Sequence, residues 1–90
     1  MFEWHEGKNE SNFSKHGVRF EDSLMVFKSP MVIIEDTRYD YGEVRYIGIG
    51  KNPQGIFYTV VYTLRGDKIR IISARKAHRK ERLMYENSYG

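Results

Sequence analysis

Arginine and lysine side chains are concentrated in one stretch of the chain, RGDKIRIISARKAHRKER at positions 65–82. This stretch holds eight of the 15 basic residues and two of the 12 acidic residues. Its formal charge is therefore +6, whereas the rest of the chain, with seven basic and ten acidic residues, sums to −3. Such segregation favours a polyanionic partner, above all nucleic acid, although a solvated basic surface has the same composition.

Few side chains are suited to proton transfer near neutral pH. The histidines are His5, His16 and His78, and imidazole is the side chain that titrates nearest neutrality. Glu81 is the strongest acidic candidate near the basic stretch, but an ion pair within a helix would explain it equally well. The histidines lack the spacing of metal ligands and the chain has no cysteine, so the sequence predicts neither a metal nor another cofactor.

The hydrophobic pattern predicts an α+β fold in a single domain over residues 1–90. We expect a small antiparallel sheet of about four strands, with two N-terminal helices and one C-terminal helix. Helices are predicted at about 7–16, 20–28 and 76–88, and strands at 31–37, 43–50, 56–64 and 68–75, after a very short strand at 2–4. No apolar run approaches the length of a membrane span and the first residues do not resemble a signal peptide, so we expect a cytoplasmic protein.

Alternation along the predicted strands assigns side chains to faces of the sheet. It places Lys68 and Arg70 with Ile72 and Ala74, and the opposite face then carries Ile69, Ile71 and Ser73. If helices cover the isoleucines, the other face is open and displays Lys68 and Arg70, with Arg75 at the end of the strand. Arg45 belongs to another strand of this sheet.

Tyrosines on the third long strand could take part in the same surface. Tyr58 and Tyr62 share a face by alternation. Guanidinium groups bind phosphate at two points and aromatic rings stack unpaired bases, so arginines and tyrosines on an open face would suit an RNA strand. Ordinary cross-strand packing of the tyrosines is the alternative.

The first predicted helix has polar side chains on its apolar side. Asn9, Asn12 and His16 lie on nearly the same face as Phe13, its one large apolar residue. If Phe13 points inward, these polar groups need partners. They either satisfy neighbouring backbone groups or line a site.

Two segments together resemble the BrnT family, the toxins of type II toxin–antitoxin pairs. They are FEWHEGKNESNFSKHGVRFEDSLMVF near the start and YTLRGDKIRIISARKAHRKERLMYE near the end, and the order KxxxN, KHG, RIISARKA and ERxxY is specific. The resemblance implies a compact fold similar to RelE and the microbial ribonucleases, and a ribonuclease that arrests translation. It also implies a small BrnA-like antitoxin whose complex binds its own operator DNA.

The family pattern also identifies individual positions, and three positions depart from it. The departures are His5 in place of Asp, Arg19 in place of a small capping residue, and His78 in place of a small polar residue. The matching residues are Lys8, Asn12, Lys15, His16, Gly17, Arg45, Arg70, Ser73, Arg75, Glu81, Arg82 and Tyr85.

The resemblance and the charges together predict a metal-independent endoribonuclease. We expect Arg45, Arg70 and Arg75 to bind phosphate and stabilise the transition state, with His16 or Glu81 as the proton-transfer group. The residues predicted to bind nucleic acid are Lys15, Lys68, Lys76, Arg79, Arg82, Tyr58 and Tyr62. Two alternatives use the same basic surface: a non-catalytic nucleic-acid-binding module, and an interaction protein that docks only an acidic partner.

Overall fold

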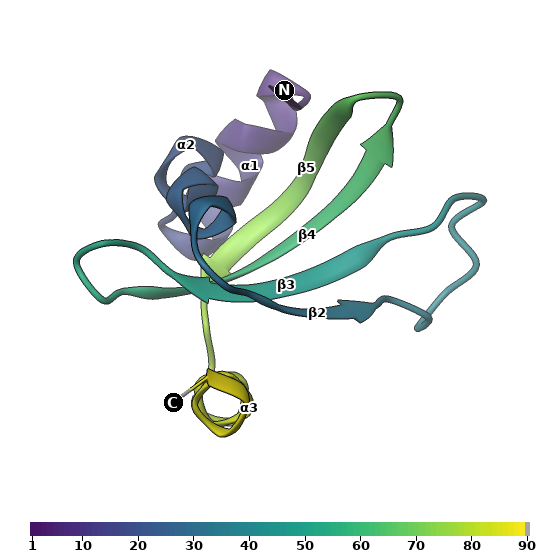
Figure 1. The fold of residues 1–90 in the computed structure, drawn as a ribbon. Coiled ribbons are helices and arrows are strands. Elements are labelled where there is room, and N and C mark those ends of the chain that lie inside the picture. The colour runs from purple at the N-terminus through teal and green to yellow at the C-terminus, as the bar shows by residue number, and fades with distance from the viewer. Residues whose placement is uncertain (90) are drawn as a thin grey trace.

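The computed structural model describes residues 1–89 and has an α+β architecture, as predicted (Figure 1). The strands are β1 (Phe2–Glu3), β2 (Val32–Glu35), β3 (Tyr46–Lys51), β4 (Phe57–Arg65) and β5 (Lys68–Lys76). The helices are α1 (Glu6–His16), α2 (Phe20–Ser23), the 3₁₀ helix η1 (Leu24–Lys28) and α3 (Arg79–Tyr89).

The sheet differs from the predicted one in the number and direction of its strands. It has five strands in the order β1-β5-β4-β3-β2, and β1 pairs parallel with β5 whereas the other neighbours are antiparallel. The expectation of about four antiparallel strands is therefore wrong in detail. A two-residue strand has no periodicity to reveal its partner, and Phe2 and Glu3 pair with Ile69 and Arg70 from the far end of the chain.

The helices lie on both sides of the sheet. Figure 1 shows α1 and α2 on one side and α3 on the other. The core lies between the sheet and the N-terminal helices and contains Val18, Phe20, Val26, Tyr58, Val60, Tyr62, Ile71 and Ala74, with the predicted core residue Trp4 packed against it. The side with α1 and α2 is therefore the apolar side of the sheet.

Two buried asparagines attach α1 to the rest of the molecule. The side chain of Asn12 donates to the carbonyls of Val18 (2.8 Å) and Ala74 (2.7 Å) and accepts from the backbone N–H of Ala74 (3.1 Å). Asn9 accepts from the backbone N–H of Phe20 at 2.8 Å. These polar groups satisfy backbone atoms, which is the structural alternative left open by the sequence.

Phe13 and His16 do not share the burial of the asparagines. Both are exposed, and the Arg19 guanidinium lies over the Phe13 ring, 4.1 Å from its centroid. The condition considered above, that Phe13 points into the core, is therefore not met. The burial of α1 comes from hydrogen-bonded amides, which an apolar periodicity does not detect.

The helix ends follow local hydrogen bonding. The His5 imidazole accepts from the backbone N–H of Lys8 (3.3 Å) at the start of α1, and Gly17 (φ 72°) ends that helix in the left-handed conformation. The carboxylate of Asp22 accepts from the Arg19 N–H (3.0 Å), which compensates for the missing hydroxyl cap of α2. Departures from the family pattern at His5 and Arg19 thus have local partners.

The C-terminal helix is shifted from its predicted position. It runs Arg79–Tyr89 instead of 76–88, because Lys76 continues β5 and the Tyr89 hydroxyl donates to the Met31 carbonyl at 2.7 Å. The sequence also predicts that this helix frays beyond Glu86, whereas in the described residues it continues to Tyr89.

Candidate functional site

A β-bulge in β5 decides which side chains face away from the core. Val61 pairs with Ser73 and Tyr62 pairs with Ile71, so Ile72 is the extra residue between them. Ile71 and Ala74 are both buried in the core, although they are three positions apart. Simple alternation is therefore wrong for this strand. Ser73 is on the other side of the sheet from Ile71, and Arg70 is on the other side from Ala74.

The same bulge puts Arg70, Ser73 and Arg75 on one face. Their partners across the ladder are Thr63, Val61 and Thr59, which alternate with the core residues of β4. Arg45, directly before β3, precedes Tyr46, which packs against the core, and so belongs to the side away from it. We call the sheet side opposite α1 and α2, defined by Arg45, Arg70 and Arg75, the arginine face.

At one end of the arginine face, Glu81 of α3 holds Arg75. Its carboxylate accepts two hydrogen bonds from the Arg75 guanidinium, both at 2.8 Å, one from the Thr59 hydroxyl (2.9 Å) and one from the His78 backbone N–H (2.7 Å). Burial raises the pKa of Glu81, but the hydrogen bonds from Arg75, His78 and Thr59 outweigh it and lower this pKa to about 2. A carboxylate so fully bonded is a poor proton acceptor near neutral pH.

Arg70 has a carboxylate partner from the N-terminal strand. Its guanidinium donates to Glu3 of β1 at 3.1 Å, and Lys68 is 3.9 Å from the same carboxyl group. The parallel β1–β5 pairing thus supplies a counter-charge to the middle of β5. The N-terminal strand therefore contributes the carboxylate that holds Arg70 on the arginine face.

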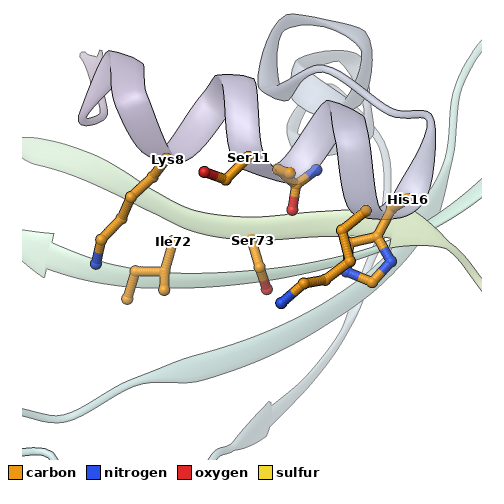
Figure 2. Close-up of a pocket in the computed structure, with 7 residues that line it drawn as sticks. Lys8, Ser11, His16, Ile72 and Ser73 are labelled. Carbon is orange, nitrogen blue, oxygen red and sulfur yellow. The ribbon is translucent and has the colours of Figure 1, made fainter.

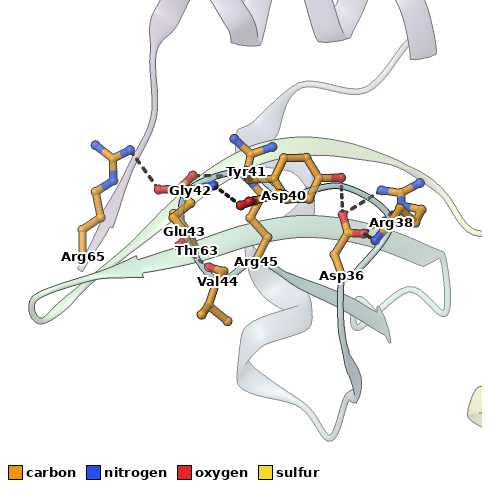
Figure 3. Close-up of polar contacts among 10 residues, drawn as sticks. All are labelled: Asp36, Arg38, Asp40, Tyr41, Gly42, Glu43, Val44, Arg45, Thr63 and Arg65. Atoms are coloured by element: carbon orange, nitrogen blue, oxygen red, sulfur yellow. Dashed lines mark hydrogen bonds and ion pairs between the residues drawn. The ribbon is translucent and has the colours of Figure 1, made fainter.

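Arg45 is held at the other end of the face by a loop (Figure 3). Its Nε donates to Glu43 at 3.1 Å, and its guanidinium lies 4.0 Å from the centroid of the Tyr41 ring. Glu43 also accepts from Arg65 at 3.4 Å, and hydrogen bonding to Arg45 lowers the pKa of Glu43 against a smaller effect of burial. Each of the three arginines therefore has a fixed acidic neighbour.

A basic pocket lies beside this face, between α1 and β5 (Figure 2). It has a volume of about 180 Å³ and is lined by Lys8, Ser11, Asn12, Lys15, His16, Ile72 and Ser73. Among the described residues that line it, none is a carboxylate. In Figure 2, Ser73 lies between Lys8 and His16, so a strand residue of the arginine face also borders the pocket.

Comparison with known proteins identifies the family of the chain. The family model of the BrnT ribonuclease toxin of type II toxin–antitoxin systems matches residues 4–81, a range that includes Arg45, Arg70, Arg75 and Glu81. The chain belongs to the BrnT family. The resemblance recognised in the sequence is thereby confirmed.

A crystal structure supports the same family assignment. The Brucella abortus ribonuclease toxin BrnT has 29% sequence identity to this chain and a TM-score of 0.69, with 88% of this chain and 99% of the other covered. Among curated proteins, none matches the chain. The expected likeness of the BrnT-family fold to RelE and the microbial ribonucleases stays a prediction.

Two tyrosines expected on the arginine face are buried on the opposite side. Tyr58 and Tyr62 are each 6% exposed and belong to the core beneath the N-terminal helices, where the Tyr62 ring meets Phe27 at 5.2 Å. Burial raises the pKa of both. The prediction that these rings stack RNA bases is wrong. The two tyrosines do share one side of the sheet, as alternation predicted, but it is the side covered by the helices.

Three other basic residues predicted to bind nucleic acid, Lys76, Arg79 and Arg82, form a separate group near α3. Lys76 and Arg82 line a pocket with Phe57, and the Arg82 guanidinium lies 5.3 Å from the centroid of that ring. Arg79 borders a neighbouring hollow with Arg82, and Lys80 is exposed. These side chains therefore do not converge with Arg45 and Arg70.

The basic pocket between α1 and β5 contains side chains that were not predicted as site residues from the sequence. Lys8 and Ser73 match the BrnT pattern, whereas no pattern pointed to Ser11. Helical spacing could have linked Lys8, Ser11 and Lys15, which lie on one side of α1 at i, i+3 and i+7. Their meeting with Ser73 depends on tertiary packing that no local pattern encodes.

Within residues 1–89, no three His, Asp or Glu side chains gather closely enough to hold a metal ion. No helix in the same residues combines the length and the apolar character needed to cross a bilayer.

Proposed function

We propose that this BrnT-family chain is a metal-independent endoribonuclease whose RNA substrate binds across the arginine face. The observation that carries the proposal is the placement of Arg45, Arg70 and Arg75 on one side of the sheet, next to the basic pocket that contains His16. A single strand of RNA presents a series of phosphates to such a surface.

The proposed reaction is an attack of the ribose 2′-oxygen on the adjacent phosphorus. The 2′-hydroxyl loses its proton, the bond to the 5′-oxygen breaks, and that oxygen takes up a proton, leaving a 2′,3′-cyclic phosphate and a 5′-hydroxyl. Guanidinium groups stabilise the charge that develops on the phosphorane oxygens. Arg75 is the leading candidate for this role because Glu81 fixes its planar group at two points.

His16 is the preferred proton-transfer group, and Glu81 becomes a positioning residue for Arg75. His16 is exposed and shares its pocket with Lys15 and Ser73, so a ribose bound there could reach the imidazole. Glu81 has a pKa of about 2 and is occupied by four donors, which suits a fixed counter-charge better than a base.

The partner proposed for this toxin is a small BrnA-like antitoxin, with operator DNA bound through the antitoxin. Cleavage of RNA would arrest translation, and we place this activity in the cytoplasm because translation occurs there. Membership of a type II toxin–antitoxin family supports a protein partner of this kind.

Incubation of the purified protein with end-labelled RNA in EDTA tests the activity. We expect steady cleavage with cyclic-phosphate and 5′-hydroxyl ends, and His16→Gln should reduce the rate by about 10²–10⁴-fold. Lys28→Gln is the matched control, since Lys28 is an exposed cation on η1. A salt-sensitive mobility shift without products would instead identify a non-catalytic binding module.

Inducible expression with and without the adjacent reading frame tests the biological role. Growth arrest by the toxin alone, relieved by co-expression of its neighbour, is the expected result. If the toxin alone caused no arrest while being produced in folded form, the proposed translation block would be wrong.

A further inference from the structure

The loop between β2 and β3 is closed by a buried carboxylate. The Asp36 side chain is 1% exposed and accepts from the Arg38 backbone N–H (3.2 Å), from the Arg38 guanidinium (2.8 Å, twice) and from the Tyr41 hydroxyl (3.0 Å). The backbone N–H of Asp36 donates to the Arg45 carbonyl at 2.8 Å, across the base of the loop. The loop is therefore an ordered structure built around one charge (Figure 3).

The Asp36 carboxylate remains ionised well into the acid range. The hydrogen bond from Arg38 is the main reason that the pKa of Asp36 lies well below its usual range, and it outweighs burial. Burial and the Asp36 contact raise the pKa of Tyr41, so the phenol stays a donor. The hydrogen bond between these two groups therefore keeps its charged acceptor and its neutral donor through the physiological pH range.

A continuous stack runs outward from Arg45 through this loop. The Arg45 guanidinium lies 4.0 Å from the Tyr41 ring centroid, and the Tyr39 ring meets the Tyr41 ring edge-on with centroids 5.8 Å apart. Tyr39 is 72% exposed. The ring at the outer end of the stack is therefore open to solvent while its support is fixed.

We infer that the exposed Tyr39 ring is a stacking platform for one unpaired base of the RNA, next to a phosphate held by Arg45. The inference rests on the proposed function and names the base-binding part of its surface. Single-stranded nucleic acids are bound by alternating cations and aromatic rings, and Tyr39 and Arg45 are such a pair on one support. Tyr39 rests against Tyr41, which is held by Asp36, and a support that is fixed beforehand lowers the entropy lost when a base stacks.

The position of Tyr39 favours RNA over a protein ligand. The Tyr41 and Tyr39 rings extend from Arg45, which is on the same side of the sheet as Arg70 and Arg75. An RNA strand whose phosphates bind these arginines would therefore pass the loop. The tyrosines first expected to stack bases are in the core, so the exposed ring of the β2–β3 loop takes their place. Recognition of single-stranded RNA commonly uses stacking of unpaired bases on aromatic side chains.

Binding of a non-cleavable 2′-O-methyl oligonucleotide tests the inference independently of catalysis. Tyr39→Ala should weaken binding by about fivefold to 150-fold, the usual range for loss of one stacked base, and Tyr39→Phe should restore it. A scan with a single abasic site should find one position at which the wild-type protein loses the same affinity. At that position the Tyr39→Ala protein should lose no more, because both changes remove one contact.

The control is Phe13→Ala, which removes another exposed aromatic ring that lies against a guanidinium, that of Arg19 on the helical side. Its RNA affinity should match that of the wild-type protein, and thermal unfolding confirms that both variants fold. Unchanged RNA affinity of Tyr39→Ala would overturn the inference, and weaker binding of the antitoxin in the same variant would identify a protein-binding surface instead.

The outcomes separate the inference from the proposed function. Wild-type protein that binds the oligonucleotide through Tyr39 but cuts no RNA would support the platform and contradict the nuclease. Wild-type protein that cuts RNA while Tyr39→Ala binds and cuts equally well would contradict the platform alone. Absence of RNA binding by the wild-type protein would overturn both.

Discussion

The two ends of the arginine face hold their guanidinium groups in different ways. At the α3 end, Glu81 bonds Arg75 directly at two points of 2.8 Å. At the loop end, the carboxylate of the buried Asp36 does not bond the Arg45 guanidinium but accepts from Tyr41, whose ring lies against that guanidinium. The first arrangement fixes one cation by charge, and the second fixes a whole loop that then carries the cation. We therefore expect chemistry to depend most on the first and stability most on the second.

The largest expected effect is on catalysis at the α3 end. Arg75→Ala should reduce the rate of RNA cleavage by about 10²–10³-fold, the usual cost of removing one well-placed donor to a developing anion. Arg75→Lys keeps the charge but loses the two-point contact with Glu81, so it should recover only part of the rate. The measurement is cleavage of labelled RNA by protein whose circular dichroism matches the wild type.

A folded Arg75→Ala protein that cuts at the parental rate would mean that the reacting phosphate lies elsewhere. The equivalent change at Arg45 should reduce the rate less, because that cation lies at the end of the face near the loop. Equal losses at both positions would remove the contrast between the two ends.

The next effect is on stability at the loop end. Asp36→Ala should lower the free energy of unfolding by about 2 kcal/mol, because a buried acceptor of hydrogen bonds from a charged group is lost. The exposed Arg38 guanidinium can then bond water, which limits the loss. Asp40→Ala is the control, since the exposed Asp40 accepts, among residues 1–89, one hydrogen bond, from the Gly42 N–H at 3.0 Å. Urea unfolding measures both, and equal effects would contradict the central role of Asp36.

The contribution of the Glu81 carboxylate to stability should depend on pH. The pKa of Glu81 is lowered to about 2 in the folded chain, so its contribution is complete above its ordinary value near 4.5 and is lost as the pH falls towards 2. Wild-type protein should exceed Glu81→Gln in unfolding free energy by on the order of 2 kcal/mol at neutral pH, with a gap that narrows below about pH 4.5. A gap independent of pH would show that the charge of Glu81 does not stabilise the fold.

The smallest effect is expected from the arginines outside the face. Arg79→Gln and Arg82→Gln should each reduce the slope of log affinity against log salt by about 0.7 for single-stranded RNA, without a large change in the cleavage rate at saturation. Lys28→Gln should leave the slope unchanged. A loss of rate as large as that of Arg75→Ala would extend the site into α3.

Local patterns predicted the elements well, because their causes are local. The left-handed position of Gly17, the proline that follows Ser29 and the β-branched runs locate most helices and strands. The pairing of β1 with β5 and the burial of Asn9 and Asn12 depend on residues far apart in sequence. Alternation and helical spacing contain no information about either.

The candidate site divides in the same way. Charge segregation identified the stretch with Arg70 and Arg75, and the resemblance to BrnT proteins identified the family. Neither the bulge at Ile72 nor the side of the sheet occupied by Tyr58 and Tyr62 could be obtained from period-two alternation. The Asp36 loop also had no signature, because its side chain bonds form between residues with ordinary turn composition.

The bulge at Ile72 allows two arginines at an odd spacing to share a face. Arg70 and Arg75 are five residues apart, a separation that would put them on opposite sides of a regular strand, and the extra residue returns them to the same side. Deletion of Ile72 would therefore leave a regular ladder in which Arg70, Ser73 and Arg75 all keep their sides. Among related toxins, the two arginines should be separated either by five residues with a bulge between them or by four residues without one.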